Sequence, residues 1–141
     1  MCQALAHTQN ILSTWLAKYP ECFPPIVINI TDGESTDGDP ASAANAIKNL
    51  LVNDGPVLLF NVHISSQNSL PIEFPNSDKG LPDQYAQLLF RISSLLPDYM
   101  RGIAQQEGIP ATDGARGFVF NGDMVSVIRF LDIGTRPSNL R

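Results

Sequence analysis

Residues 28–36 read INITDGEST, and this stretch decides how the chain is expected to fold. Together with Ile26 and Val27, it begins as a β-branched run and ends in a polar, turn-forming cluster. Ligands of open α/β sheets usually lie outside the carboxyl ends of the strands. The stretch therefore predicts a strand over residues 26–31, followed directly by a candidate binding loop.

The flanking sequence places helices and a second strand around this first one. Residues 3–19 carry apolar or small side chains at steps of three and four, which indicates one face of a helix. Residues 39–51 predict a second helix, because Asp39 is a good N-cap and Pro40 suits the first helical position. The nearly continuous apolar run at 57–64 is typical of a strand that is covered on both faces.

The C-terminal half continues the alternation of helices and strands. Three prolines and no periodicity predict a long loop at 65–82. The last helix is expected to bury four apolar residues, Val125, Ile128, Leu131 and Ile133. The sequence thus predicts an α/β fold with three parallel strands and helices on both faces. The remaining predicted elements are helices at 83–96, 97–108 and 123–134 and a strand at 117–121.

Composition narrows the classes of function. The chain has 141 residues, 43% hydrophobic residues and a formal net charge of −5, which argues against a nucleic-acid partner. No apolar stretch approaches the length of roughly 18 residues that a membrane span needs. The N-terminus does not resemble a secretory signal, so we expect a cytoplasmic protein in which Cys2 and Cys22 are free thiols.

Two segments resemble a known family. The strand that ends in Thr31-Asp32-Gly33, with the Ala-rich helix and apolar strand after it, resembles the second half of a von Willebrand factor A domain. Residues 115–135 are similar to the closing strand and helix of its bacterial members. The resemblance implies a doubly wound, Rossmann-like three-layer α/β/α fold with a mostly parallel sheet. It also implies a divalent cation at the carboxyl end of the sheet, the metal-ion-dependent adhesion site.

The resemblance covers only part of that site. In the family, the cation takes ligands from three loops, and Asp32 matches the ligand of the third. The Asp-x-Ser-x-Ser segment of the first loop does not occur in the sequence. The threonine loop of the family would lie just before Met1, so residues 1–141 are expected to form a single domain of this type that lacks about three N-terminal strands.

The function expected from this resemblance is non-catalytic protein binding. Asp32 would hold Mg²⁺, Mn²⁺ or Ca²⁺ in a partial site, with a supporting loop around it. An alternative for the same residues is that Asp32 and Thr31 make turn hydrogen bonds while Asp39 caps a helix. The supporting loop comprises Thr31, Gly33, Glu34, Ser35 and Thr36.

Two other functions are alternatives to protein binding. One is a site-incomplete, truncated fragment that only self-associates. The other is an Asp-dependent, phosphatase-like hydrolase, because Asp32-Gly33-Glu34 places two acids after a strand. A downstream acidic pair and a phosphate-binding lysine are not evident, and no nucleophile elbow or phosphate-binding glycine loop occurs, so we do not expect an enzyme.

The expected loss of upstream strands also predicts an oligomeric state. The strand at 26–31 is interior in the family, whereas here its outer edge is expected to lack a neighbour. Lysine, proline or a bulge usually blunts such an edge, and IVINIT has no lysine or proline and no sign of a bulge. We therefore expect a homodimer whose interface includes residues 3–31, formed by pairing these strands or by exchanging the first helix.

Overall fold

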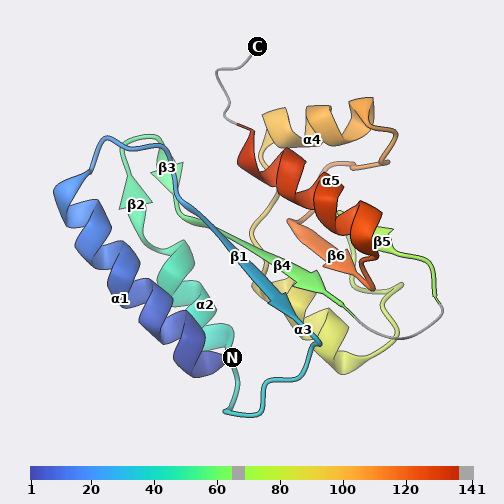
Figure 1. The fold of residues 1–141 in the computed structure, drawn as a ribbon, viewed down its shortest axis with the longest axis horizontal. Coiled ribbons are helices and arrows are strands. Elements are labelled where there is room, and N and C mark those ends of the chain that lie inside the picture. Colours follow the sequence, from blue (N-terminus) through green and yellow to red (C-terminus); the bar gives the residue numbers. More distant parts are fainter. Residues whose placement is uncertain (65–68, 137–141) are drawn as a thin grey trace.

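A four-stranded, mostly parallel β-sheet organises the fold of the computed structural model, which describes residues 1–64 and 69–136 (Figure 1). The strand order is β1-β4-β6-β5, so β1 and β5 form the two edges. β1, β4 and β6 are parallel, and the short β5 pairs with β6 in the antiparallel direction. These strands span Ile26–Thr31 (β1), Leu58–His63 (β4), Ile72–Glu73 (β5) and Phe118–Phe120 (β6).

Five helices in the described residues cover both faces of this sheet. Successive residues of a strand point to opposite faces. Leu59 accordingly joins a core cluster with α1, α2 and α3, whereas Phe60 and Val62 join a second cluster with α4 and α5. The helices span Cys2–Lys18 (α1), Ala41–Lys48 (α2), Gln84–Ile92 (α3), Asp98–Gln106 (α4) and Met124–Thr135 (α5).

The predicted mixed α/β architecture is confirmed, and the first strand has its predicted bounds. The strand predicted at 57–64 is present as β4, and its predicted burial is confirmed, because five of its six residues are buried. The expected number of strands is wrong: the sheet has four strands rather than about three, because β5 adds an antiparallel edge next to β6. Part of the predicted loop at 65–82 is therefore a strand, and residues 65–68 lie outside the described residues.

The second helix is shorter than predicted. It ends at Lys48, and a two-stranded hairpin follows, with β2 at Leu51–Val52 and β3 at Gly55–Pro56. The prediction that the helix continues to Leu51 is therefore wrong. The physical reason is that Leu51 and Val52 pair with Pro56 and Gly55 across a turn, and Gly55 has a φ of 133°, which favours glycine.

The third helix also ends early, at Ile92 rather than Leu96. Ser93 has extended backbone angles, and Ser94 then binds β4 from both its backbone and its side chain. The N–H of Ser94 donates to the carbonyl of Leu59 (2.7 Å), and its hydroxyl accepts from the N–H of Leu59 (2.9 Å). These bonds to the sheet replace the last helical turn.

The last helix buries fewer of its apolar residues than predicted. Ile133 is buried as expected, but Val125, Ile128 and Leu131 are exposed. The residues that contact the core are instead Phe130, Ile133 and Gly134. With Met124, four apolar side chains of α5 are thus left on the surface.

No helix in the described part of the chain is both long enough and apolar enough to cross a membrane.

Candidate functional site

The Thr31–Gly33 loop leaves β1 in a tight turn. The hydroxyl of Thr31 accepts a hydrogen bond from the N–H of Gly33 (3.1 Å), as the alternative to a metal role predicts. Gly33 is buried with a φ of 107°, and a Cβ atom at this position would lie 2.9 Å from the His63 ring. Asp32 and Glu34 are exposed on either side of this glycine.

Two acidic residues after this turn, Asp37 and Asp39, accept hydrogen bonds from the first residues of helices. Both carboxylate oxygens of Asp37 accept from α1, one from the N–H of Cys2 (2.9 Å) and the other from the N–H of Gln3 (2.9 Å). These backbone hydrogen bonds, together with the Met1 amino group 2.7 Å away, hold the pKa of Asp37 far below its usual range. Asp39 accepts from the N–H of Ala41 (2.9 Å), the first residue of α2, although the N-cap position itself is Pro40 rather than Asp39 as predicted.

These contacts leave only a partial set of ligands for a cation. Ser35 donates its hydroxyl to Asp37 (3.1 Å), and the Thr31 hydroxyl takes part in the turn. Within residues 1–64 and 69–136, no group of three or more His, Cys, Asp or Glu side chains is placed to hold a metal ion. A cation at Asp32 would depend on water for most of its ligands, and this site stays a prediction.

His63 joins the carboxyl ends of the three parallel strands. It ends β4, its Nδ1 accepts from the N–H of Asn121 after β6 (3.3 Å), and its ring stacks on Phe120 with centroids 4.7 Å apart. Burial lowers the pKa of His63, against the opposing effects of a hydrogen bond to the backbone of Asp32 and of nearby carboxylates. His63 thus connects β4 to the end of β6 through its hydrogen bond to Asn121 and its stacking on Phe120.

The outer edge of β1 has no neighbouring strand among the described residues. On the inner side, the N–H of Leu58 donates to the carbonyl of Pro25 (3.0 Å), and the N–H of Ile64 donates to that of Thr31 (2.9 Å). Backbone groups alternate in direction along a strand, so odd-numbered residues face β4. The N–H and C=O groups that point outward are therefore those of Ile26, Ile28 and Ile30.

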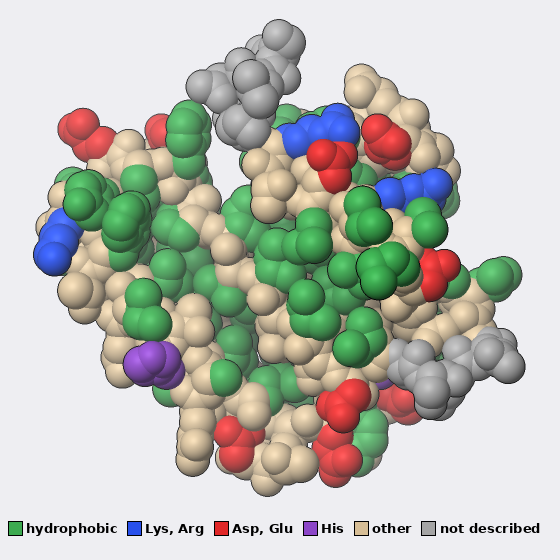
Figure 2. Space-filling view, in the orientation of Figure 1, with side chains coloured by type: hydrophobic (Ala, Val, Ile, Leu, Met, Phe, Trp, Pro, Cys, Tyr) green, Lys and Arg blue, Asp and Glu red, His purple; other side chains and the backbone are tan. Residues whose placement is uncertain are grey.

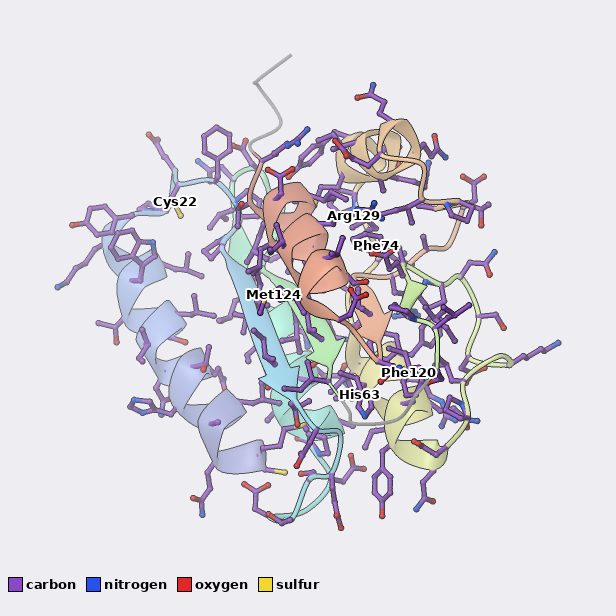
Figure 3. The ribbon with its side chains drawn as sticks, turned by 45° about the vertical axis from the view of Figure 1, so that its right-hand side comes forward. Cys22, His63, Phe74, Phe120, Met124 and Arg129 are labelled. Atoms are coloured by element: carbon purple, nitrogen blue, oxygen red, sulfur yellow. The ribbon has the colours of Figure 1, made fainter. Side chains whose placement is uncertain are left out.

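Apolar side chains of α5 are exposed on a helix that packs on the same face of the sheet as Ile26 and Ile28. Met124, Ile128 and Leu131 follow one another at helical spacing and form one stripe, with 75%, 58% and 37% of their surfaces exposed. On β1 itself, Ile30 is 50% exposed. Hydrophobic side chains gather over this part of the molecule in Figure 2, and Figure 3 shows Met124 between α5 and β1.

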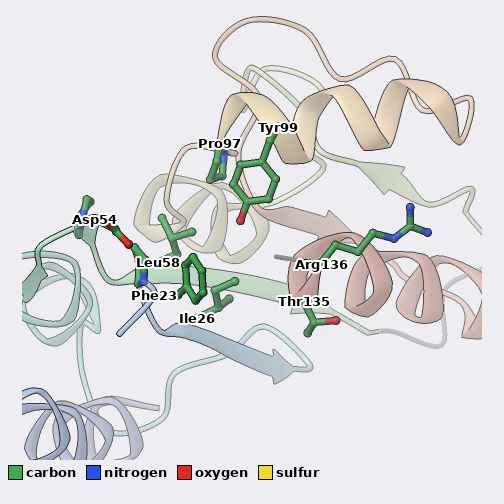
Figure 4. A pocket seen from close by; sticks show the side chains of 10 residues that line it. Phe23, Ile26, Asp54, Leu58, Pro97, Tyr99, Thr135 and Arg136 are labelled. Atoms are coloured by element: carbon green, nitrogen blue, oxygen red, sulfur yellow. The ribbon is translucent and has the colours of Figure 1, made fainter. Parts of the chain in front are cut away.

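A cavity of about 740 Å³ opens at the other end of β1 (Figure 4). Ile26 and Leu58 contribute strand side chains to its wall, and Tyr99 and Arg136 close it from α4 and the end of α5. Burial raises the pKa of the Tyr99 phenol. We use the name open edge surface for the outer edge of β1, the α5 stripe and this cavity.

Comparison of the chain with models of protein families, with curated proteins and with solved structures returns no match.

The structure brings together part of what the sequence predicts. Thr31, Asp32 and Gly33 lie at the carboxyl edge of the sheet, next to His63. The predicted open edge of β1 is present as well. The α5 stripe and the cavity were missed, although the spacing of Met124, Ile128 and Leu131 is visible in the sequence. Periodicity finds an apolar face of a helix but does not say whether anything covers it.

Proposed function

We propose that this chain is a non-catalytic protein-binding module of the von Willebrand factor A type, with a doubly wound, Rossmann-like fold. Its binding surface is the open edge surface. A cytoplasmic location fits the two free thiols, Cys2 and Cys22.

The observation that carries this proposal is the uncharged outer edge of β1, with exposed apolar residues of α5 on a helix that packs on the same sheet. Strand edges of this kind are templates for pairing with another polypeptide, and stable proteins usually protect them with charge, proline or a bulge. β1 contains no charged residue and no proline. Contiguous exposed apolar surface on a folded protein marks an interaction site. A net charge of −5 does not favour nucleic acid as the ligand.

Self-association is the second candidate function, and the same edge favours it. A homodimer through β1 and the first helix would cover the outward N–H and C=O groups of Ile26, Ile28 and Ile30 with those of a second copy. Cyclic two-fold dimers are the commonest closed assemblies. The proposal therefore needs an experiment that identifies the protein bound at this surface.

A photo-reactive amino acid at Ile30 supplies that experiment. With the chain expressed in cells of its own source, we expect one defined protein to be cross-linked at Ile30 and identified by mass spectrometry. The matched control carries the same group at Leu70, which is 87% exposed and precedes β5 at the opposite edge of the sheet. Cross-linking of the same proteins from both positions, or of none from Ile30, would show that the open edge surface is not a binding site.

We also propose that Asp32 contributes to a weak divalent-cation site, with the loop from Thr31 to Thr36 around it. Mg²⁺ is bound by one or two carboxylates with several waters, and Ca²⁺ accepts a looser set of oxygens. Calorimetric titration with Mg²⁺, Mn²⁺ and Ca²⁺ should give binding heat that Asp32→Ala abolishes. The control is Asp113→Ala, which removes an exposed carboxylate elsewhere. Heat that persists in Asp32→Ala would remove Asp32 from the site.

A further inference from the structure

We infer that the open edge surface binds an extended, apolar segment of a partner polypeptide, which adds to the sheet as a new strand next to β1. This inference rests on the proposed function and specifies the chemistry of the partner.

The backbone of β1 supplies the first argument. Ile26, Ile28 and Ile30 direct three N–H and three C=O groups away from β4, at the regular spacing of a strand. Backbone groups in this arrangement are matched by another extended chain, because only a strand repeats donors and acceptors at the same interval. Addition of a strand to an exposed sheet edge is a general mode of peptide recognition.

The side chains around the outer edge of β1 determine which residues the added strand should contain. On one face, Ile26 and Ile28 pack against a cluster that contains Phe130 and Ile133 of α5, and the exposed α5 stripe lies on the same helix. On the other face, Val27 packs into the cluster of α1, α2 and α3. A strand between these two faces would be covered on both sides, as β4 is. Such strands are nearly continuously apolar rather than alternating.

The position of α1 favours a single segment over a second copy of the whole chain. In Figures 1 and 3, α1 lies on the side of β1 away from β4, beyond the outer edge of the strand. It is held there by packing against α2. One added strand is about 4.8 Å wide in the plane of the sheet. A second copy paired through its own β1 would bring its own α1 to the same place.

The cavity indicates where a large side chain of the partner would lie. Ile26 lines this cavity, so it opens on the α4 and α5 face of the sheet. Directly opposite residues on neighbouring strands place their side chains on the same face. The partner residue opposite Ile26 therefore points toward Phe23, Tyr99 and Leu58, and a large apolar or aromatic side chain matches this wall.

The test uses a synthetic peptide as the probe. It alternates valine and isoleucine over the length of β1, with a phenylalanine next to one of the two lysines that form its termini. It is N-methylated at every second amide, so that only one of its edges can pair. The control peptide has the same side chains with every amide methylated. Binding is followed by nuclear magnetic resonance on the whole chain, with the amide signals of β1 as the readout.

We expect the probe to bind and to slow hydrogen exchange at Ile28 and Ile30, while the fully methylated control does not bind. Ile30→Lys should weaken binding by about tenfold or more, since it places an ammonium group in the apolar surface. Leu70→Lys should leave the affinity unchanged. Binding that does not protect these amides, or no binding at all, overturns the inference.

Two further outcomes separate this inference from the proposed function. If the free chain has about twice its mass of 15.4 kDa and these amides are already protected, a second copy occupies the edge. That result overturns the inference while protein binding at the surface stands. If cross-linking from Ile30 also captures nothing, the proposed function fails as well.

Discussion

His63 is the residue on which the carboxyl edge of the sheet depends. Its Nδ1 accepts a hydrogen bond from Asn121, which requires that this nitrogen carry no proton. Burial lowers its pKa below the unperturbed value of about 6.5. The unfolded chain therefore binds a proton at higher pH than the folded chain does.

The stability of the protein should accordingly fall as the pH is lowered below about 6.5. The contribution of neutral His63 is fully present above that pH and is lost as the unfolded state takes up its proton. Urea unfolding at a series of pH values measures the effect. His63→Gln should flatten this part of the profile, whereas His7→Gln, at an exposed position of α1, should leave it as in the wild type. An unchanged profile in His63→Gln would contradict the role given to the imidazole.

At this scale the sequence predicts the environment of a residue better than its partner. The apolar run around His63 indicates a buried or rim position for this residue. Its partner Asn121 is 58 positions away and becomes adjacent only when β6 pairs with β4. Likewise, the carboxylate of Asp37 accepts hydrogen bonds from Cys2 and Gln3 at the start of α1, which lie 35 and 34 positions away in the sequence. Such pairings depend on tertiary geometry that local pattern does not contain.

Among the elements, β6 shows how closely strand and helix are packed. Gly117 precedes it, and a Cβ atom there would lie 2.0 Å from the ring of Phe60. Phe60 is fully buried and contacts Phe130 of α5 edge-on, with ring centroids 5.8 Å apart. The ring of Phe60 is therefore packed between the backbone at Gly117 and the ring of Phe130.

Gly117→Ala should lower the free energy of unfolding by about 1–3 kcal/mol or more, because overpacking of a well-packed core forces side chains and backbone to shift. The matched control is Gly102→Ala inside α4, where an added Cβ meets no atom within 4 Å. This change should raise stability by about 0.5–1 kcal/mol, as alanine favours the helix over glycine. Thermal unfolding compares the two variants, and equal effects would contradict this description of the core.

Element types with strong periodicity or capping are predicted well from the sequence. α1, β1 and β4 lie where the pattern places them, and α3 begins after Asp83, which caps it by accepting from the N–H of Ala86 (2.8 Å). The two-residue strands β2, β3 and β5 were not predicted, since so short a segment carries no readable period. The exposed face of α5 was predicted as buried because amphipathic spacing alone does not identify a packing partner.

On the scale of the whole molecule, the two edges of the sheet differ in how well they are protected against pairing with another strand. β5 ends one edge as a two-residue strand, and short edge strands resist further pairing. β1 ends the other edge with six uncharged residues, and the cavity at Phe23 opens beside its first residue. This asymmetry is the basis of both the proposed function and the inferred strand addition.

Native-state hydrogen exchange of the six β1 amides tests this account most directly. In the free chain, the amides of Val27, Asn29 and Thr31 bond to β4 and should exchange slowly. The amides of Ile26, Ile28 and Ile30 point to the open edge and should exchange much faster, so that protection alternates along the strand. Equal, strong protection of all six amides in a chain with the mass of a single copy would contradict the open edge of β1.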